Sequence, residues 1–190
     1  MSTSDSDHVA SLVERIGRLV RAREAGTGLN PAQWEVLRYL ARANRFSRSP
    51  SAVADYLATT RGTVSQTLIS LESKGLIRKG VNARDRRGAT LELTDAGGAL
   101  LEKADPMDEL TRALAALPPL HATLLSQALS RVLDTLLAAN DRKAFGVCAT
   151  CRHFRHEAFP GRPDGPHQCG LIDAPLAAGE ATRICAEHAA

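Results

Sequence analysis

The sequence lacks any apolar run long enough to cross a membrane. Although 44% of the 190 residues are hydrophobic, no stretch approaches the roughly eighteen apolar residues that a spanning helix needs. The N-terminal residues, MSTSDSD, are polar and acidic, so they also lack the basic start and apolar stretch of a signal peptide. We therefore expect a cytoplasmic protein without a membrane partner, with residues 1–7 disordered.

Cysteine is missing from the first 147 residues, and no catalytic group of side chains stands out anywhere in the chain. Two tail histidines, His153 and His156, lie three positions apart, but neither a paired carboxylate nor a nucleophile accompanies them. We therefore expect no enzyme. The four cysteines lie together near the C-terminus, and in a reducing cytosol such a group is more typical of metal binding or redox chemistry than of disulfides.

Positive charge is concentrated in the middle of the chain. The net charge is only +3, yet residues 42–87 hold ten Lys and Arg against three Asp and Glu, which leaves this segment at +7. A basic field on an otherwise acidic chain is suited to phosphate binding, although a solvated basic surface would have the same composition.

Apolar periodicity and capping residues predict a mainly α fold with one small β-hairpin. Helices are expected at residues 8–24, 31–43, 50–57 and 60–74, then after Thr94, with a restart at Asp105-Pro106 and a final helix ending near Asn140. Two strands are expected at 76–80 and 89–93, joined by a polar, basic loop. Helix, short helix, second helix and basic hairpin, in this order, predict a winged helix-turn-helix within residues 8–140.

The first and last of these helices carry more leucine, valine and isoleucine than a small core needs. Such surplus apolar faces at both chain ends predict a homodimer interface built from the two terminal helices. The alternative is that both faces pack within one monomer.

The second helix of the motif is expected to enter the major groove of double-stranded DNA. Placing Val64, Leu68 and Leu71 inward turns the opposite face outward. There Gln66 can pair with adenine, Arg61 can reach guanine or phosphate, and hydroxyls at the start of the helix suit phosphate contacts. The candidate DNA-binding residues of this helix are Thr60, Arg61, Thr63, Ser65 and Gln66.

The segment PSAVADYLATTRGTVSQTLISLESKGLIRKGVNARDRRGATLELTDAGGALL resembles the DNA-binding core of MarR-type regulators. The resemblance rests on Glu72–Ile77, Asp85–Arg87 and Leu93–Gly97, and extends over roughly residues 8–140. It implies that Arg87 enters a minor groove with Asp85 fixing its geometry, while Arg84 and Arg86 support phosphate contacts. It also implies a symmetric dimer on a pseudo-palindromic operator. Some winged helices bind protein instead, and this alternative stays open.

Residues 141–190 form a cysteine-rich tail. Because the tail is too short to fold around an apolar core of its own, we expect a bound metal to stabilise it. Cys148-x-x-Cys151 holds two thiolates on one turn, and Cys169 and Cys185 follow as single cysteines. The four suit an iron–sulfur cluster, either 2Fe–2S or 4Fe–4S. Zinc is the alternative: it could bind the same four cysteines, or use His188 together with Cys185 and leave Cys169 spare. A thiol switch without metal is the third alternative.

These features predict a dimeric transcriptional regulator whose tail binds an iron–sulfur cluster and senses redox state or iron. Because the tail directly follows the last helix, we expect it to act by shifting that helix. The alternative is a MarR-type regulator that responds to a small-molecule effector, with zinc only stapling the tail.

Overall fold

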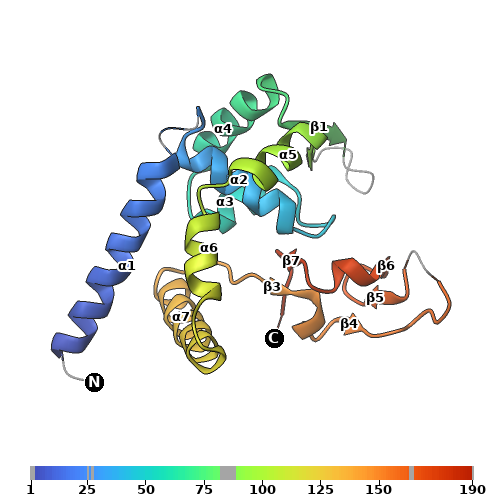
Figure 1. Ribbon diagram of the computed structural model, residues 1–190. Helices are drawn as coiled ribbons and strands as arrows, with labels where there is room; N and C mark the ends of the chain where they lie inside the picture. The colour runs from blue at the N-terminus through green and yellow to red at the C-terminus, as the bar shows by residue number, and fades with distance from the viewer. Residues whose placement is uncertain (1–2, 25, 27, 82–88, 163–164, 190) are drawn as a thin grey trace.

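The computed structural model describes residues 3–24, 26, 28–81, 89–162 and 165–189. Figure 1 shows a winged-helix unit from which α1 projects, with α6 and α7 at one side and the tail at another. The winged-helix part consists of α1 (Thr3–Glu24), α2 (Pro31–Arg42), α3 (Pro50–Tyr56), α4 (Arg61–Ser73), β1 (Ile77–Val81), β2 (Ala89–Leu93), α5 (Asp95–Ala104), α6 (Asp108–Ala115) and α7 (Pro119–Ala139).

The predicted helix starts are confirmed where a capping side chain was recognised. Asn30 accepts a hydrogen bond from the backbone N–H of Gln33 at 2.9 Å, and Gln33 returns one to the Asn30 N–H at 3.0 Å. Thr60 and Thr94 cap α4 and α5 in the same way. These bonds satisfy N–H groups that the first turn of a helix leaves without partners.

Helix α1 begins earlier than expected. It starts at Thr3, so residues 3–7, which we expected to be disordered, are helical. Asp5 lies in the first turn, where a carboxylate interacts favourably with the positive end of the helix dipole.

The main core surrounds α2, whose apolar side chains are fully buried. Trp34, Leu37 and Leu40 meet the inward face of α4 and the wing strand β2. The inward orientation of Val64, Leu68 and Leu71 is confirmed, because all three are at most 2% exposed. This packing fixes the outward face of α4.

A buried charge network ties the end of α1 to the break between α5 and α6. Arg38 of α2 lies 2.8 Å from Glu24 and 2.6 Å from Asp105, and all three side chains are largely buried. Asp105 stands immediately before Pro106, where the predicted interruption of the helix is confirmed.

The tail is richer in strands than the sequence suggested. It contains β3 (Gly146–Val147), η1 (Cys148–Thr150), β4 (Phe154–Arg155), β5 (His167–Cys169), β6 (Ala174–Leu176), η2 (Ala178–Glu180) and β7 (Ile184–Cys185). Strands β3 and β7 pair with each other, and β4, β5 and β6 form a second antiparallel sheet. The expected single hairpin is therefore joined by two small sheets, whose strands are too short to leave a period-two pattern in the sequence.

The tail is packed against the winged-helix unit. Its Ala186 belongs to the main core, and Phe145 packs edge-on against Tyr39 and Tyr56. The backbone N–H of Asn44 donates to the Ile184 carbonyl at 2.8 Å. The contact runs to the segment between α2 and α3, which the sequence did not indicate.

The apolar faces of α1 and α7 remain open in the monomer. Large side chains that are 37–66% exposed include Val9, Leu12, Val13, Ile16 and Leu19 of α1, and Leu120, Leu124, Leu125, Leu129, Val132, Leu133 and Leu136 of α7. Within the described part of the chain, no helix is both long and apolar enough to cross a membrane.

Candidate nucleic-acid interface and cysteine cluster

The outward face of α4 has the composition of a recognition helix. Arg61, Gly62, Ser65 and Gln66 are all exposed on it. Arg61 forms no ion pair within the described residues, so its guanidinium is available for a phosphate or a guanine. The helix therefore presents one cation and several polar groups along a single face.

The two threonines at the start of α4 serve the helix itself. The Thr60 hydroxyl accepts a hydrogen bond from the Thr63 N–H at 3.2 Å and lies 2.9 Å from the Thr63 hydroxyl. Both side chains remain exposed, so each retains hydrogen-bonding capacity toward solvent. Their first role is to define where the recognition helix begins.

The strands of the wing pair in a regular antiparallel register, from Ile77 opposite Leu93 to Val81 opposite Ala89. The positive charges at their base are neutralised locally, since Arg78 pairs with Glu92 and Lys79 with Glu72. The predicted DNA contacts Arg84, Asp85, Arg86 and Arg87 lie outside the described residues.

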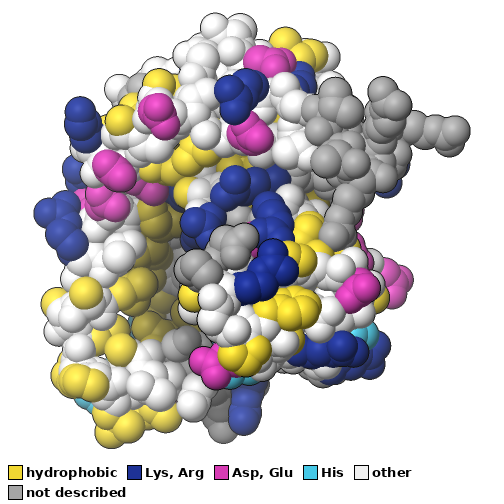
Figure 2. Space-filling view, turned by 90° about the vertical axis from the view of Figure 1, so that its right-hand side faces the viewer, with side chains coloured by type: hydrophobic (Ala, Val, Ile, Leu, Met, Phe, Trp, Pro, Cys, Tyr) yellow, Lys and Arg dark blue, Asp and Glu magenta, His cyan; other side chains and the backbone are white. Residues whose placement is uncertain are grey.

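Figure 2 looks onto the side of the wing and the tail and shows Lys and Arg side chains gathered near its centre. Arg45 and Arg48 of the α2–α3 segment and Arg183 of the tail line a cavity of about 240 Å³. Burial and the neighbouring Arg183 lower the pKa of Arg48. Glu180 offsets part of the positive charge of these arginines through its ion pair with Arg45 at 2.5 Å.

Three of the four cysteines meet in one small apolar cluster. Cys148 and Cys185 are buried and in side-chain hydrogen-bond contact, and Cys169 packs against the same cluster. Phe46, Phe154 and Leu176 complete it. Cys151 follows Cys148 on the same turn and is half-buried.

The sulfur pair receives hydrogen bonds from the winged-helix unit. The side-chain nitrogen of Asn44 donates a hydrogen bond to the Cys148 sulfur at 3.3 Å. The Cys148 S–H donates to Cys185, which lowers the pKa of Cys185 to about 5 despite burial, with Asn44 and Ser47 adding to the effect. The same bond and burial raise the pKa of Cys148. The sequence did not predict that Asn44 and Ser47 contact the cysteine pair. These residues lie more than about a hundred positions from the cysteines, and so distant a pair leaves no spacing pattern in the sequence.

The described arrangement does not yet form a complete metal site. Among the described residues, no three His, Cys, Asp or Glu side chains are placed to hold one metal ion. His188, the alternative ligand, has its ring nitrogen 3.0 Å from the Thr150 hydroxyl. The ring of the buried His167 lies against those of Phe154 and His156, with centroid distances of 5.1 and 4.9 Å.

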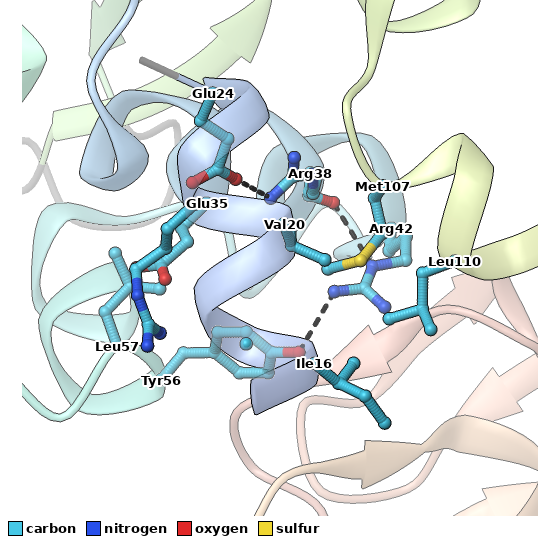
Figure 3. A pocket seen from close by; sticks show the side chains of 12 residues that line it. Ile16, Val20, Glu24, Glu35, Arg38, Arg42, Tyr56, Leu57, Met107 and Leu110 are labelled. Carbon is cyan, nitrogen blue, oxygen red and sulfur yellow. Dashed lines mark hydrogen bonds and ion pairs between the residues drawn. The ribbon is translucent and has the colours of Figure 1, made fainter. Parts of the chain in front are cut away.

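A second cavity, of about 390 Å³, lies between α1, α2, α3 and α6 (Figure 3). Ile16 and Val20 of α1 and Met107 and Leu110 near α6 form apolar walls. Arg42 crosses one side and donates to the Tyr56 hydroxyl at 3.1 Å. The cavity therefore combines apolar walls with cationic groups and with the carboxylates of Glu24 and Glu35.

Helix-turn-helix, paired wing strands and an exposed polar recognition face define a winged-helix DNA-binding architecture. Residues 27–88 match the profile of the MarR family. S. aureus MepR in its DNA-binding conformation is 25% identical, with a TM-score of 0.60 over 69% of this chain and 97% of that one. The S. aureus MepR–DNA complex is 24% identical, with a TM-score of 0.57 over 71% and 99% of the two chains.

A MarR transcriptional regulator from Methanosarcina mazei Go1 shares the fold at 17% identity, with a TM-score of 0.58 over 73% of this chain and 99% of that one. No curated protein matches the chain. Together the matches show that the fold of this chain is similar to that of MarR-type winged-helix proteins. These neighbours align over almost their whole length and still leave about three-tenths of this chain unmatched, a share close to the size of the 50-residue tail.

Proposed function

We propose that this protein is a dimeric, sequence-specific DNA-binding regulator of the MarR type. The observation that carries the proposal is the exposed face of α4, with Arg61, Ser65 and Gln66 held outward by the buried residues behind them. The DNA-binding conformation of S. aureus MepR, to which this chain is 25% identical, agrees with this function. The open apolar faces of α1 and α7 supply an interface for a second copy, and a two-fold dimer reads a pseudo-palindromic operator.

Binding-site selection from random duplex DNA, followed by fluorescence anisotropy on the selected sequence, tests this function. Gln66→Ala removes a base contact and is expected to weaken binding by about 1–3 kcal/mol at one operator position. Arg61→Ala removes a phosphate or guanine contact. If Arg61 contacts phosphate, the slope of the logarithm of the binding constant against the logarithm of the salt concentration should become shallower by about one. Lys103→Ala on α5 removes an equally exposed charge and serves as the control. A selection that yields no preferred sequence would contradict the proposal.

We further propose that the tail cysteines bind an iron–sulfur cluster, of either the 2Fe–2S or the 4Fe–4S type, through which the protein senses redox state or iron. The support is chemical: Cys148, Cys169 and Cys185 share a dry, aromatic-lined cluster, and hydrogen bonds already reach its sulfurs. Binding requires Cys151 and Cys169 to approach the Cys148–Cys185 pair. Zinc on the same thiolates is the alternative.

Anaerobic purification with measurement of visible absorption, iron, sulfide and zinc distinguishes these cofactors. Matched iron and sulfide in a brown protein support the cluster. A colourless protein with about one zinc per chain supports structural zinc, provided that reconstitution with ferrous iron and sulfide does not form a cluster. Absence of both metals from the wild-type protein and from the reconstituted protein overturns the cofactor proposal.

The cavity of Figure 3 favours a second candidate function, response to a small-molecule effector. It lies where α1 meets the helix-turn-helix, so a ligand there could shift the dimer helices against the DNA-binding unit. Its walls suit an apolar or aromatic molecule with a negative group, which Arg42 would face. A screen of aromatic acids for release of the selected operator, with Leu110→Trp filling the cavity as the insensitive variant, tests it.

A further inference from the structure

The cavity of about 240 Å³ between the α2–α3 segment and the tail is lined by three arginines and one glutamate. Arg45 and Arg48 come from the segment between α2 and α3, and Glu180 and Arg183 come from the tail. The other two lining residues are an alanine and a glycine of the tail. Three guanidinium groups and one carboxylate give the walls of this cavity a net charge of +2.

Arg45 and Glu180 are bound to each other and form a fixed wall. One terminal nitrogen of Arg45 donates to the Glu180 carboxylate at 2.5 Å, and the other donates to the Pro175 carbonyl. The guanidinium also lies over the Phe46 ring, 4.6 Å from its centroid. Glu180 in turn accepts a hydrogen bond from the Ala177 N–H at 3.1 Å. The charges of this pair therefore offset each other, and the excess positive charge belongs to the two remaining arginines.

Arg48 and Arg183 are each held by one hydrogen bond at the C-terminal end of α2. The Nε–H of Arg48 donates to the Ala43 carbonyl at 3.2 Å, and a terminal nitrogen of Arg183 donates to the Ala41 carbonyl at 3.4 Å. Both side chains are half-buried. Among the residues that the structure describes, neither guanidinium forms an ion pair with a carboxylate. Two partly desolvated positive charges thus line one cavity without a counter-ion of their own.

This arrangement has the chemistry of a phosphate site. Burial, together with the positive charge of Arg183, lowers the pKa of Arg48, which shows that the two cations repel each other. A dianion between them would remove this repulsion and accept charge-assisted hydrogen bonds, which are about twice as strong as neutral ones. The planar fork of a guanidinium matches the spacing of phosphate oxygens. The cavity is smaller than the roughly 300 Å³ at which pockets for drug-sized ligands begin, so the ligand is small.

We propose that Arg48 and Arg183 form a binding site for a small phosphate dianion, either inorganic phosphate or the phosphate group of a small monoester. One arginine comes from the winged-helix unit and the other from the tail, so the bound anion joins these two parts of the chain. Figure 1 shows the tail strands on the side of the winged-helix unit away from α4, which favours a free anion over the DNA backbone. The inference depends neither on DNA binding nor on a metal in the tail.

Isothermal titration calorimetry of the full chain with inorganic phosphate tests the site. The titration is made at about pH 8, where a phosphate group carries close to two negative charges, and at constant ionic strength. Arg48→Met and Arg183→Met should each raise the dissociation constant at least about tenfold, because each removes charge-assisted hydrogen bonds. Arg142→Met removes an exposed arginine outside the cavity and should bind phosphate like the wild type.

Glu180→Gln provides a variant with the opposite expected effect. It removes the negative charge from the wall and retains a side-chain oxygen that can accept from the Ala177 N–H. Phosphate should then bind at least about threefold more tightly, because the net charge of the cavity rises. A variant that merely disturbed the fold would bind more weakly, and circular dichroism of all four variants confirms that they are folded.

A measurement on the wild-type protein locates the site without any substitution. The Arg48 carbonyl accepts a hydrogen bond from the N–H of Leu91 in β2 at 2.8 Å. Phosphate that holds Arg48 should slow hydrogen exchange at Leu91 by at least about threefold. Equal exchange with and without saturating phosphate would overturn the assignment to this cavity.

The remaining outcomes separate the possible sources of the phosphate group. Methyl phosphate that binds more tightly than inorganic phosphate would identify the ligand as a phosphorylated compound, and the reverse would identify it as the free anion. Absence of binding by both, or binding that Arg48→Met and Arg183→Met leave unchanged, overturns the inference. If these variants weaken binding to the selected operator and leave phosphate binding unchanged, the arginines contact the DNA backbone instead. The proposed DNA-binding function stands in each of these cases.

Discussion

At the scale of single residues, Gly97 shows most directly how tightly the wing is joined to α5. A Cβ at this position would lie 2.2 Å from the carbonyl oxygen of Leu76 and 2.8 Å from the Leu93 side chain. The neighbouring Gly98 has nothing within 4 Å of its Cβ position. Of these two neighbouring glycines, only Gly97 faces the Leu76 backbone at close range.

Gly97→Ala should lower the free energy of unfolding by about 1–3 kcal/mol, because the backbone of Leu76 cannot yield without moving the wing. Gly98→Ala is the control and should raise it by about 0.5–1 kcal/mol, since alanine favours a helix over glycine. Urea denaturation at one fixed protein concentration measures both. A Gly97→Ala variant as stable as the wild type would contradict the described close approach.

Arg38 is the residue whose loss should cost most. Burial opposes its charge, yet the hydrogen bonds that its guanidinium donates to Asp105 and Glu24 outweigh this and raise the pKa of Arg38. Only 10% of its side chain is exposed, against 3% for Glu24 and 14% for Asp105. Without the guanidinium, two carboxylates would face each other away from water.

Arg38→Met should therefore destabilise the protein by about 3–5 kcal/mol, the range for removing one partner of a buried ion pair. The exposed pair of Arg18 and Glu14, with side chains 71% and 61% exposed, provides the matched control. Arg18→Met should change stability by less than about 1 kcal/mol. Thermal unfolding of both variants distinguishes the two cases, and equal small effects would refute the buried network.

At the scale of elements, α7 is the clearest example of a helix that is incomplete in the monomer. None of its residues is buried, although one side carries a continuous row of leucines and valine. An exposed apolar face of this length is typical of an interaction surface. The sequence predicted this surplus from helical periodicity alone.

Leu133→Glu should separate the dimer into monomers, because the two-fold interface would bury two unpaired carboxylates. We expect the dissociation constant of the dimer to rise at least about a hundredfold, measured by sedimentation equilibrium. Leu171→Glu carries the same change at a tail position of similar exposure, 50% against 56%, and should leave the dimer intact. A Leu133→Glu variant that remains dimeric would place the interface elsewhere.

At the scale of the whole molecule, the tail and the winged-helix unit share side chains of one core. Phe145 lies 5.2 Å from Tyr56 and 6.2 Å from Tyr39 between ring centroids, in edge-on geometry. The tail therefore supports the α2–α3 region in addition to any role of its cysteines. This arrangement predicts that both parts unfold together.

Phe145→Ala should lower the midpoint of a single calorimetric transition by roughly 4–8 °C, corresponding to about 2 kcal/mol for a chain of this size. Phe159→Ala, at a half-buried tail position outside the main core, should shift the midpoint by less than about half as much. Two separate transitions in the wild type would show that the tail folds independently.

The sequence by itself determined the starts of the capped helices α2, α4 and α5 and the inward face of α4. These features depend on contacts three or four positions apart, such as Thr60 with Thr63, and such contacts leave a readable period. The contacts assigned to Arg84, Asp85, Arg86 and Arg87 at the wing tip remain predictions.

Only the tertiary structure decided what the tail packs against. The sequence placed it after the final helix, and the expectation that it acts through that helix stays a prediction. The folded chain joins Asn44 to Cys148, 104 positions away, and Arg38 to Asp105, 67 positions away. Such pairs arise when the burial of apolar surface brings distant segments together, and neither partner carries a local pattern that reveals the other.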